Sequence, residues 1–194
     1  MAAMDLSDMN KMSPLDLRKI IMSRVTSMLE LVAKIPDADR PRNATPRARF
    51  DVNKSVIKVE GEFICFPHAV TFTSSYQPTS LRVAGDNTEF ERALVNIIAN
   101  GCAAVALSDD PQIRLTATAG KDFIEVTIAD NGHGMDAATL AQIFQAGFTT
   151  KKQRPNHGQG LWITANIVAD LGGSIKCESE PGKGALFRIW MPAA

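Results

Sequence analysis

The sequence has no excess of either charge and only a few cysteines. Its 194 residues include 21 Lys and Arg against 21 Asp and Glu, so the formal net charge is zero. Proteins that hold nucleic acid by bulk electrostatics are strongly basic, so we expect no nucleic-acid partner. The cysteines, Cys65, Cys102 and Cys177, lie far apart. Their spacing excludes a disulfide framework and a paired-cysteine metal site.

Long apolar runs are also absent. No segment approaches the roughly 18 apolar residues of a membrane span, and no secretory signal pattern begins the chain. The hydrophobic fraction of 45% and the charged fraction of 22% are those of an ordinary globular protein. We therefore expect a soluble, cytoplasmic domain with an appendage and no membrane span in this chain.

Residues 1–46 are predicted to form a long helix followed by a linker. Ser13 and Pro14 are typical of a helix start. Apolar residues then recur at spacings of three and four along helix 15–35, at Leu17, Ile21, Val25, Met28, Val32 and Ile35. This narrow stripe favours pairing with another helix, with packing on the adjoining domain as the alternative. The proline-rich segment 36–49 indicates a linker.

The remaining residues, 47–194, predict a domain of mixed helices and strands. The patterns predict helices over 54–64 (capped by Asp51 or Asn53), 86–107, 137–145 and 161–171. They predict strands over 70–74, 113–119, 123–129, 174–178 and 185–191. In helix 86–107, the side chains expected to face inward are Phe90, Leu94, Val95, Ile97 and Ile98. Because strands and helices do not alternate as repeated units, the fold class is α+β, a two-layer α/β sandwich.

Asn96 and Asn100 are the first pair of candidate functional residues. They are four apart on the predicted helix 86–107, so both amides project from one face. An amide oxygen is a neutral hard ligand suited to Mg²⁺. Taken alone, two such residues on a helix are more often simply solvated.

The second cluster is DNGHGM, residues 130–135, directly after a predicted strand. Gly132 and Gly134 let the backbone come close to a flat or charged ligand. Asp130 ends the strand and supplies an acceptor for an exocyclic amine. A tight turn with a capping aspartate is the alternative interpretation.

Two further clusters lie between residues 144 and 161. FQAGFTTKK, residues 144–152, places Lys151 and Lys152 in a predicted loop, which by itself would be solvated surface. NHGQGL, residues 156–161, has glycines that open a helix, and N–H groups at a helix start form an anion site. A flexible turn is the alternative, and the eight-residue Walker pattern is absent.

Taken in this order, the clusters resemble the ATP-binding domain shared by sensor histidine kinases, gyrase-type ATPases and a class of heat-shock chaperones. NIIAN resembles the asparagine box, DNGHGM the first glycine box, FQAGFTTKK the phenylalanine box and lid, and NHGQGL the second glycine box. The tail GGSIKCESEPGKGALFRIWMP is most similar to the end of bacterial sensor histidine kinases. The resemblance covers about residues 49–193 and implies a Bergerat-type ATP-binding fold over residues 47–194.

The resemblance also implies roles for single residues. Asn100 would ligate Mg²⁺, and Asn96 stands where hydrolytic members carry a general-base glutamate. Asp130 would accept from the adenine amino group, and Lys151 or Lys152 would reach the terminal phosphate. The remaining residues that the resemblance implies for ATP binding are Gly132, Gly134, Phe148, Gly158, Gly160 and Leu161. The sequence departs from the family pattern at Asn156, Gln159, Ala103 and Ala185.

None of the histidines has the context of a phosphate acceptor. His68 follows a proline, and His133 and His157 lie inside the glycine boxes. Residues 1–46 resemble the second helix of a kinase dimerisation domain, so the acceptor is expected on another helical domain. The isolated chain is therefore predicted not to phosphorylate itself.

Three functions follow from these motifs. The leading one is the ATP-binding part of a two-component histidine kinase that phosphorylates a histidine supplied elsewhere, with a response regulator downstream. A nucleotide-binding regulatory module without phosphotransfer is the alternative, which the altered second glycine box and Ala185 favour. A gyrase-type ATPase is disfavoured because Asn96 cannot act as a general base.

Overall fold

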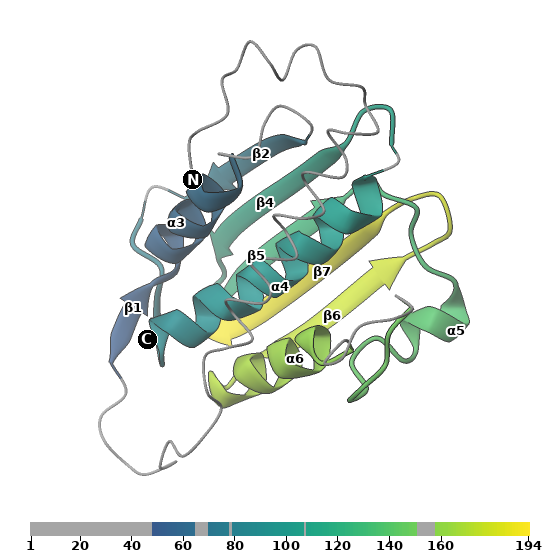
Figure 1. Ribbon diagram of the computed structural model, residues 1–194. Helices are drawn as coiled ribbons and strands as arrows, with labels where there is room; N and C mark the ends of the chain where they lie inside the picture. The colour runs from purple at the N-terminus through teal and green to yellow at the C-terminus, as the bar shows by residue number, and fades with distance from the viewer. Residues whose placement is uncertain (1–47, 65–69, 78, 107, 151–157) are drawn as a thin grey trace, which may run out of the picture.

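The computed structural model describes residues 48–64, 70–77, 79–106, 108–150 and 158–194 (Figure 1). Its main sheet contains β2 (Thr71–Tyr76), β4 (Gln112–Ala119), β5 (Phe123–Asp130), β6 (Ser174–Ser179) and β7 (Ala185–Pro192). The strand order is β2-β4-β5-β7-β6, with β2 parallel to β4 and the other pairs antiparallel. A small ribbon pairs β1 (Arg49–Asp51) with β3 (Arg82–Ala84).

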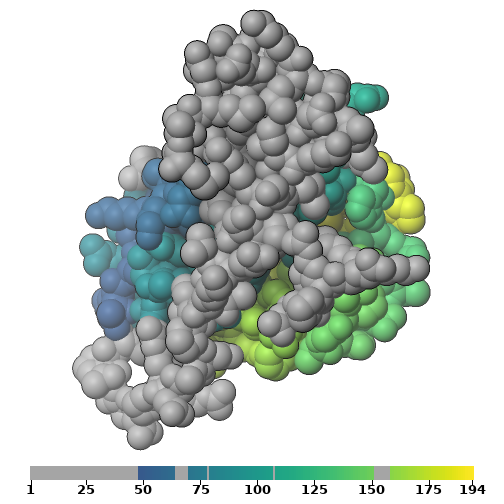
Figure 2. All heavy atoms as spheres, in the orientation of Figure 1, coloured from purple at the N-terminus to yellow at the C-terminus, as the bar shows by residue number. Residues whose placement is uncertain are grey.

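The long helices cover one face of this sheet. They are α3 (Val52–Ile64), α4 (Asn87–Val105) and α6 (Gly160–Asp170), while the short α5 (Ala137–Leu140) lies beyond β6 (Figure 1). In the space-filling view, the green and yellow-green atoms of α5 and α6 lie in the lower right part of the molecule (Figure 2). The predicted two-layer α/β sandwich is confirmed.

Alternating side chains explain why the sheet carries helices on one face. In β5, Ile124, Val126 and Ile128 are buried, whereas the intervening residues are partly exposed. The neighbouring β7 repeats this pattern, with Phe187 and Ile189 buried at the paired positions. Burying such a row removes apolar surface from water at roughly 25 cal/mol per Å². The core therefore lies between this face and the helices.

Helix α4 crosses the centre of the sandwich. Asp86 caps its start, because its carboxylate accepts hydrogen bonds from the N–H groups of Thr88 and Glu89. The residues expected to face inward, Phe90, Leu94, Val95, Ile97 and Ile98, are all buried. The observed helix agrees with the predicted one, although Leu107 lies outside the described residues.

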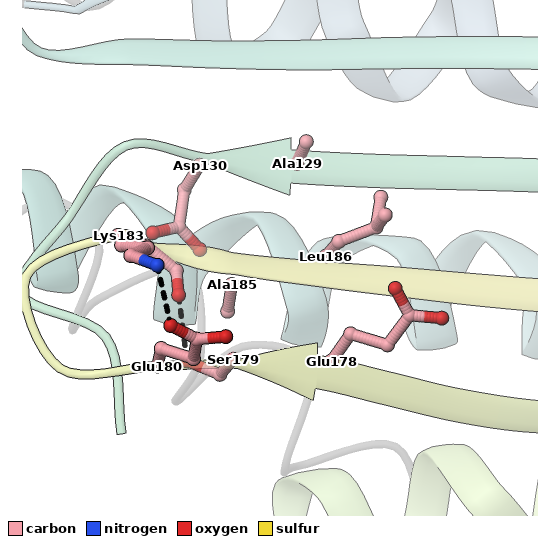
Figure 3. A pocket seen from close by; sticks show the side chains of 9 residues that line it. Ala129, Asp130, Glu178, Ser179, Glu180, Lys183, Ala185 and Leu186 are labelled. Carbon is pink, nitrogen blue, oxygen red and sulfur yellow. Dashed lines mark hydrogen bonds and ion pairs between the residues drawn. The ribbon is translucent and has the colours of Figure 1, made fainter. Parts of the chain in front are cut away.

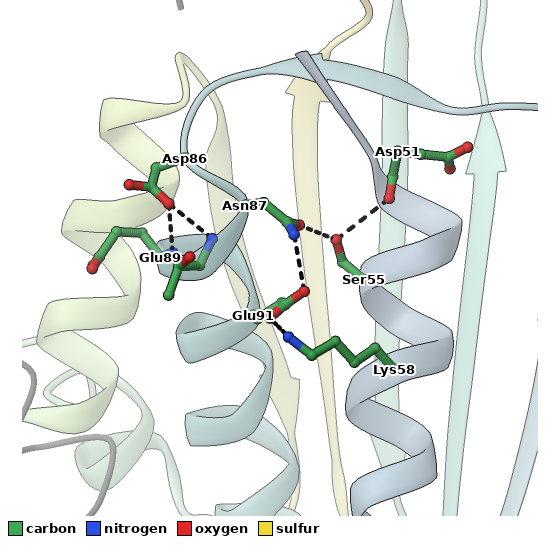
Figure 4. Close-up of polar contacts among 8 residues, drawn as sticks. Asp51, Ser55, Lys58, Asp86, Asn87, Glu89 and Glu91 are labelled. Atoms are coloured by element: carbon green, nitrogen blue, oxygen red, sulfur yellow. Dashed lines mark hydrogen bonds and ion pairs between the residues drawn. The ribbon is translucent and has the colours of Figure 1, made fainter. Parts of the chain in front are cut away.

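Polar contacts join the starts of α3 and α4 (Figure 4). Ser55, itself buried, is hydrogen-bonded to the side chain of Asn87. The Asn87 amide donates to Glu91, 3.0 Å away, and Glu91 also pairs with Lys58 at 2.6 Å. These contacts fix the first turn of α4 against α3.

The structure corrects the predicted elements in two places. Helix α3 begins at Val52 instead of residue 54, because the Asp51 side chain accepts from the Asn53 N–H and caps the start. The helix predicted over 137–145 ends at Leu140, because the backbone continues in tighter turns with bonds such as Gln142 N–H to the Thr139 carbonyl.

The short strands β1 and β3 were not predicted, since three residues are too few to show alternation. No helix among the described residues is long and apolar enough to cross a membrane. The predicted helix 15–35 and residues 36–47 of the predicted linker lie outside the described residues. The linker prediction is wrong at its end, because Arg49 pairs with Ala84 and begins β1.

Candidate functional site

Asp130 ends β5 on the face of the sheet that carries the helices. Its register partner is Ala185, and its side chain continues the inward row of Ile124, Val126 and Ile128. The carboxylate accepts a hydrogen bond from the Gly132 N–H at 2.9 Å and another from the backbone of Ala185. Burial raises the pKa of this carboxyl, against the lowering effect of those two bonds. The site therefore holds a partly buried acceptor.

Glycines allow the helix α4 to approach this carboxylate closely. A Cβ atom on Gly101 would lie 3.7 Å from Asp130 Oδ2. A Cβ atom on Gly132 would lie 2.6–2.7 Å from atoms of Ala104, too close for any side chain. The His133 N–H also donates to the Ala104 carbonyl at 3.4 Å. The second half of α4 thus borders the space around Asp130.

The turn between β6 and β7 holds the segment 130–135 from the other side. The Met135 N–H donates to Ser179 Oγ at 2.9 Å, and that hydroxyl donates to the Gly184 carbonyl at 2.6 Å. The Gly182 N–H donates to the carbonyl of His133 at 2.8 Å. Besides the capping bond from Gly132 to Asp130, the segment 130–135 is therefore hydrogen-bonded to the β6–β7 turn.

A shallow hollow of about 250 Å³ lies beside the same strand ends (Figure 3). Ala129 and Leu186 line it, and they belong to the outward rows of β5 and β7. The ion pair of Lys183 with Glu180, at 2.6 Å, stands at its edge. Asp130 and Ala185, which belong to the inward rows, line it as well, so the hollow extends around the strand ends and includes the Asp130 carboxylate.

Asn96 connects α4 to the start of α6. It is 5% exposed, and its Nδ2 lies 3.3 Å from the Gly160 carbonyl oxygen and 3.5 Å from Thr164 Oγ1. Asn100, one turn further along α4, is half-buried. The interpretation of Asn96 and Asn100 as a merely solvated pair is therefore wrong for Asn96.

The predicted phenylalanine box reaches the second glycine box. The Gly147 N–H donates to the Gly158 carbonyl at 3.1 Å. Gly158 has φ +94°, and a Cβ there would lie 2.7 Å from the Phe148 carbonyl oxygen. Phe148 and Leu161 are partly buried and pack against the core. Lys151 and Lys152 lie outside the described residues.

Comparison with known proteins identifies the family. Residues 85–194 match the model of the family described as Histidine kinase-, DNA gyrase B-, and HSP90-like ATPase. The chain belongs to this family. The matched segment contains Asn96, Asn100, Asp130 and both glycine boxes.

The curated relatives of this ATPase domain are sensor kinases. The chain is 35% identical over 124 residues to sensor histidine kinase ZraS of Klebsiella oxytoca, covering 64% of this chain and 26% of the relative. It is 36% identical over 121 residues to sensor protein FixL of Bradyrhizobium diazoefficiens, covering 62% and 24%. The predicted resemblance to sensor histidine kinases is confirmed. The matches extend over about a quarter of each relative's length.

Solved structures share the fold. The catalytic domain of histidine kinase ThkA superposes with a TM-score of 0.67 at 24% identity, over 77% of this chain and 99% of that domain. Full-length ShkA in complex with AMPPNP gives a TM-score of 0.68 at 19% identity, over 91% of this chain and 36% of ShkA.

Sequence reasoning about this ATPase domain did not single out Gly101, Thr164 or Ser179. Gly101 and Thr164 lie inside helices whose apolar periodicity gives no sign of their contacts. Ser179 ends β6, where a lone serine is unremarkable. Only the packing of α4, α6 and the β6–β7 turn brings these residues to the site.

Proposed function

We propose that the chain binds Mg²⁺-ATP and transfers the terminal phosphoryl group to a histidine on a separate helical domain. The proposal is supported by the arrangement of Asp130, the Asn96–Asn100 face of α4 and the start of α6 around one space bordered by glycines. The kinase names of the relatives support the reaction class. One solved relative is histidine kinase ThkA in complex with response regulator TrrA, and we propose a response regulator as the downstream partner here.

Asp130 would bind the adenine amino group. One carboxylate oxygen accepts the Gly132 N–H, and the other lies near Gly101 of α4. A carboxylate has about four lone-pair positions, so the bonds from the Gly132 and Ala185 backbone leave acceptor capacity for a ligand. Adenine would donate its exocyclic N–H there, whereas guanine would present a carbonyl oxygen to a negative acceptor.

The start of α6 would bind the phosphates. Gln159 precedes the helix, and its side chain makes no hydrogen bond to the first N–H groups, which form an anion site. We propose that Gly158, Gly160 and Leu161 supply backbone contacts and that Lys151 or Lys152 reaches the terminal phosphate. Phe148, packed beside Gly158, would support this end of the site.

Asn100 would hold Mg²⁺. Among the described residues, no group of three or more His, Cys, Asp or Glu side chains could hold a metal. One amide oxygen fits Mg²⁺ all the same, since this ion keeps several waters and phosphate oxygens as ligands. Bound Mg²⁺ would neutralise charge on the phosphates, and the chain itself would contribute positioning and charge stabilisation.

The acceptor histidine would come from outside the described domain. His133 is exposed, and its Nδ1 lies 2.7 Å from the Gly134 carbonyl, within the segment that shapes the site. His68 and His157 lie outside the described residues. Transfer needs an acceptor nitrogen in line with the terminal phosphate, which a separate helix can present.

Incubation with labelled ATP and a separately supplied acceptor domain tests the proposal. We expect acid-labile phosphate on the acceptor histidine only when this chain is present. If the chain binds ATP without transfer, it is a nucleotide-binding regulatory module. Ala185 favours that second function, because this buried residue paired with Asp130 has no hydroxyl for the base. If ATP does not bind, both functions are excluded.

A further inference from the structure

Three polar groups meet between α4 and α6, where the surroundings are apolar. Thr164 is fully buried, and its Oγ1 donates to the Gly160 carbonyl oxygen at 2.9 Å. Asn96 Nδ2 points at the same carbonyl oxygen from α4, at 3.3 Å, and at Thr164 Oγ1, at 3.5 Å. The carbonyl of Gly160 therefore accepts from two side chains on two helices.

This arrangement is more than packing requires. Valine and leucine would fill similar space without burying polar groups, whose transfer from water is unfavourable unless they are hydrogen-bonded. The hydrogen bonds converge on the first residue of α6, where Gln159 provides no side-chain cap. The start of α6 is thus held from the side, by α4, and the Gln159 side chain leaves its leading N–H groups uncapped.

We infer that Asn96 and Thr164 are positioning residues that clamp the Gly160 carbonyl and so place the first turn of α6 relative to Asn100. This inference rests on the proposed function. Asn96 and Asn100 are one helical turn apart, about 6 Å along α4. The clamp therefore joins the phosphate-binding N–H groups and the proposed Mg²⁺ ligand into one rigid unit. Asn96 acts through Gly160 and is not the group that touches phosphate.

The clamp serves the phosphate end of the ligand and leaves the base end alone. Asp130 is held by Gly132, Ala185 and the β6–β7 turn, none of which contacts the clamp in the hydrogen bonds described above. Loosening the clamp should therefore weaken binding of Mg²⁺-ATP, which uses both ends of the site. Binding of adenosine, which uses only the base end, should be unchanged.

Calorimetry with Mg²⁺-ATP and with adenosine tests the clamp. Thr164→Val keeps the shape and removes the hydroxyl, and we expect Mg²⁺-ATP to bind about tenfold more weakly with adenosine unchanged. Thr164→Ser keeps the hydroxyl donor, so this variant should bind Mg²⁺-ATP as the unmodified chain does. Thr127→Val is the matched control, because Thr127 pairs with Thr116 on the opposite face of the sheet and should change neither affinity.

Asn96→Leu provides a second, independent variant, with the same expected pattern. Loss of both affinities in parallel would show a general structural role and overturn the inference, as would unchanged Mg²⁺-ATP binding in both Thr164→Val and Asn96→Leu. If the unmodified chain bound neither ligand, the proposed function would fail and the clamp with it. If the unmodified chain binds both ligands, the proposed nucleotide binding holds, and a negative result in the variants then counts against the clamp alone.

Discussion

In the proposed function, Asp130 would meet two opposing demands. Recognition of an amine needs its ionised carboxylate, whereas its burial favours the protonated form and raises its pKa. Because the folded pKa exceeds the unfolded one, the folded state binds more protons between those two values. The free energy of unfolding therefore falls as the pH rises through that interval. At neutral pH the charge on Asp130 destabilises the fold.

The substitution Asp130→Asn separates the effect of the charge on ATP binding from its effect on stability. We expect ATP affinity to fall by about 1–3 kcal/mol, the value of a charge-assisted hydrogen bond. The thermal midpoint at pH 7 should change little, because removal of the buried charge offsets the loss of one acceptor oxygen for the Gly132 and Ala185 N–H groups. Calorimetry and thermal unfolding measure the two effects. Equal affinity of the unmodified chain for ATP and GTP would contradict the role of Asp130.

Asn100→Ala tests the metal ligand. We expect Mg²⁺-dependent ATP binding to weaken, and thermal unfolding of the same variant separates loss of the metal ligand from loss of the contacts that Asn100 makes within the fold. Asn166→Ala, at an exposed position on α6, is the matched control and should leave binding intact. Titration of ATP with and without Mg²⁺ gives the answer, and an unchanged Mg²⁺ effect in Asn100→Ala would contradict the assignment.

Among the elements, the turn between β6 and β7 determines the position of Asp130. Gly182 and Gly184 both have a positive φ, of 77° and 73°. Their surroundings differ, because a Cβ on Gly182 would meet nothing within 4 Å, whereas a Cβ on Gly184 would lie 1.9 Å from the Asp130 carbonyl oxygen. A side chain at either position would therefore meet a similar backbone strain, but only at Gly184 would it also clash with neighbouring atoms.

Replacing each glycine by alanine separates strain from packing. Gly182→Ala should lower the free energy of unfolding by about 1 kcal/mol, because alanine is unfavourable at a positive φ. ATP binding should be unchanged. Gly184→Ala should lose about 3 kcal/mol or more and displace Asp130. Denaturant unfolding and calorimetry measure both. Similar losses in the two variants would show that the turn does not position Asp130.

For the whole molecule, the helical stripe of residues 15–35 predicts an interface beyond the ATPase domain. An apolar stripe of this length indicates a partner, either a second copy or the acceptor helix. The chain matches its relatives over only about a quarter of their length, so other parts of such proteins offer partners for this helix.

Replacing Val25 and Met28 together by Glu tests this interface. We expect the unmodified chain to self-associate and the double variant to be monomeric, because two charges in the stripe disfavour burial. ATP affinity should be unchanged, as the ATPase domain is untouched. Sedimentation at high concentration measures the change. A monomeric unmodified chain, or one that gains acid-labile phosphate by itself, would contradict the prediction.

Local patterns were enough to predict much of the fold. The apolar spacing predicted α4, and the alternation of apolar and polar residues predicted β4 and β5. Both signals come from residues close together in the chain. The strands β1 and β3 were missed because their pairing joins residues about thirty positions apart, such as Phe50 and Val83.

The sequence by itself determined the family, the two-layer fold class and the order of the glycine and asparagine motifs, because each depends on residue types at short spacings. Only the tertiary structure decided how these motifs act together. The meeting of Asn96 with Gly160 and Thr164, the approach of Gly101 to Asp130, and the support from Ser179 join residues far apart in the chain. Such contacts follow from the packing of α4, α6 and the last strands, which no local pattern encodes.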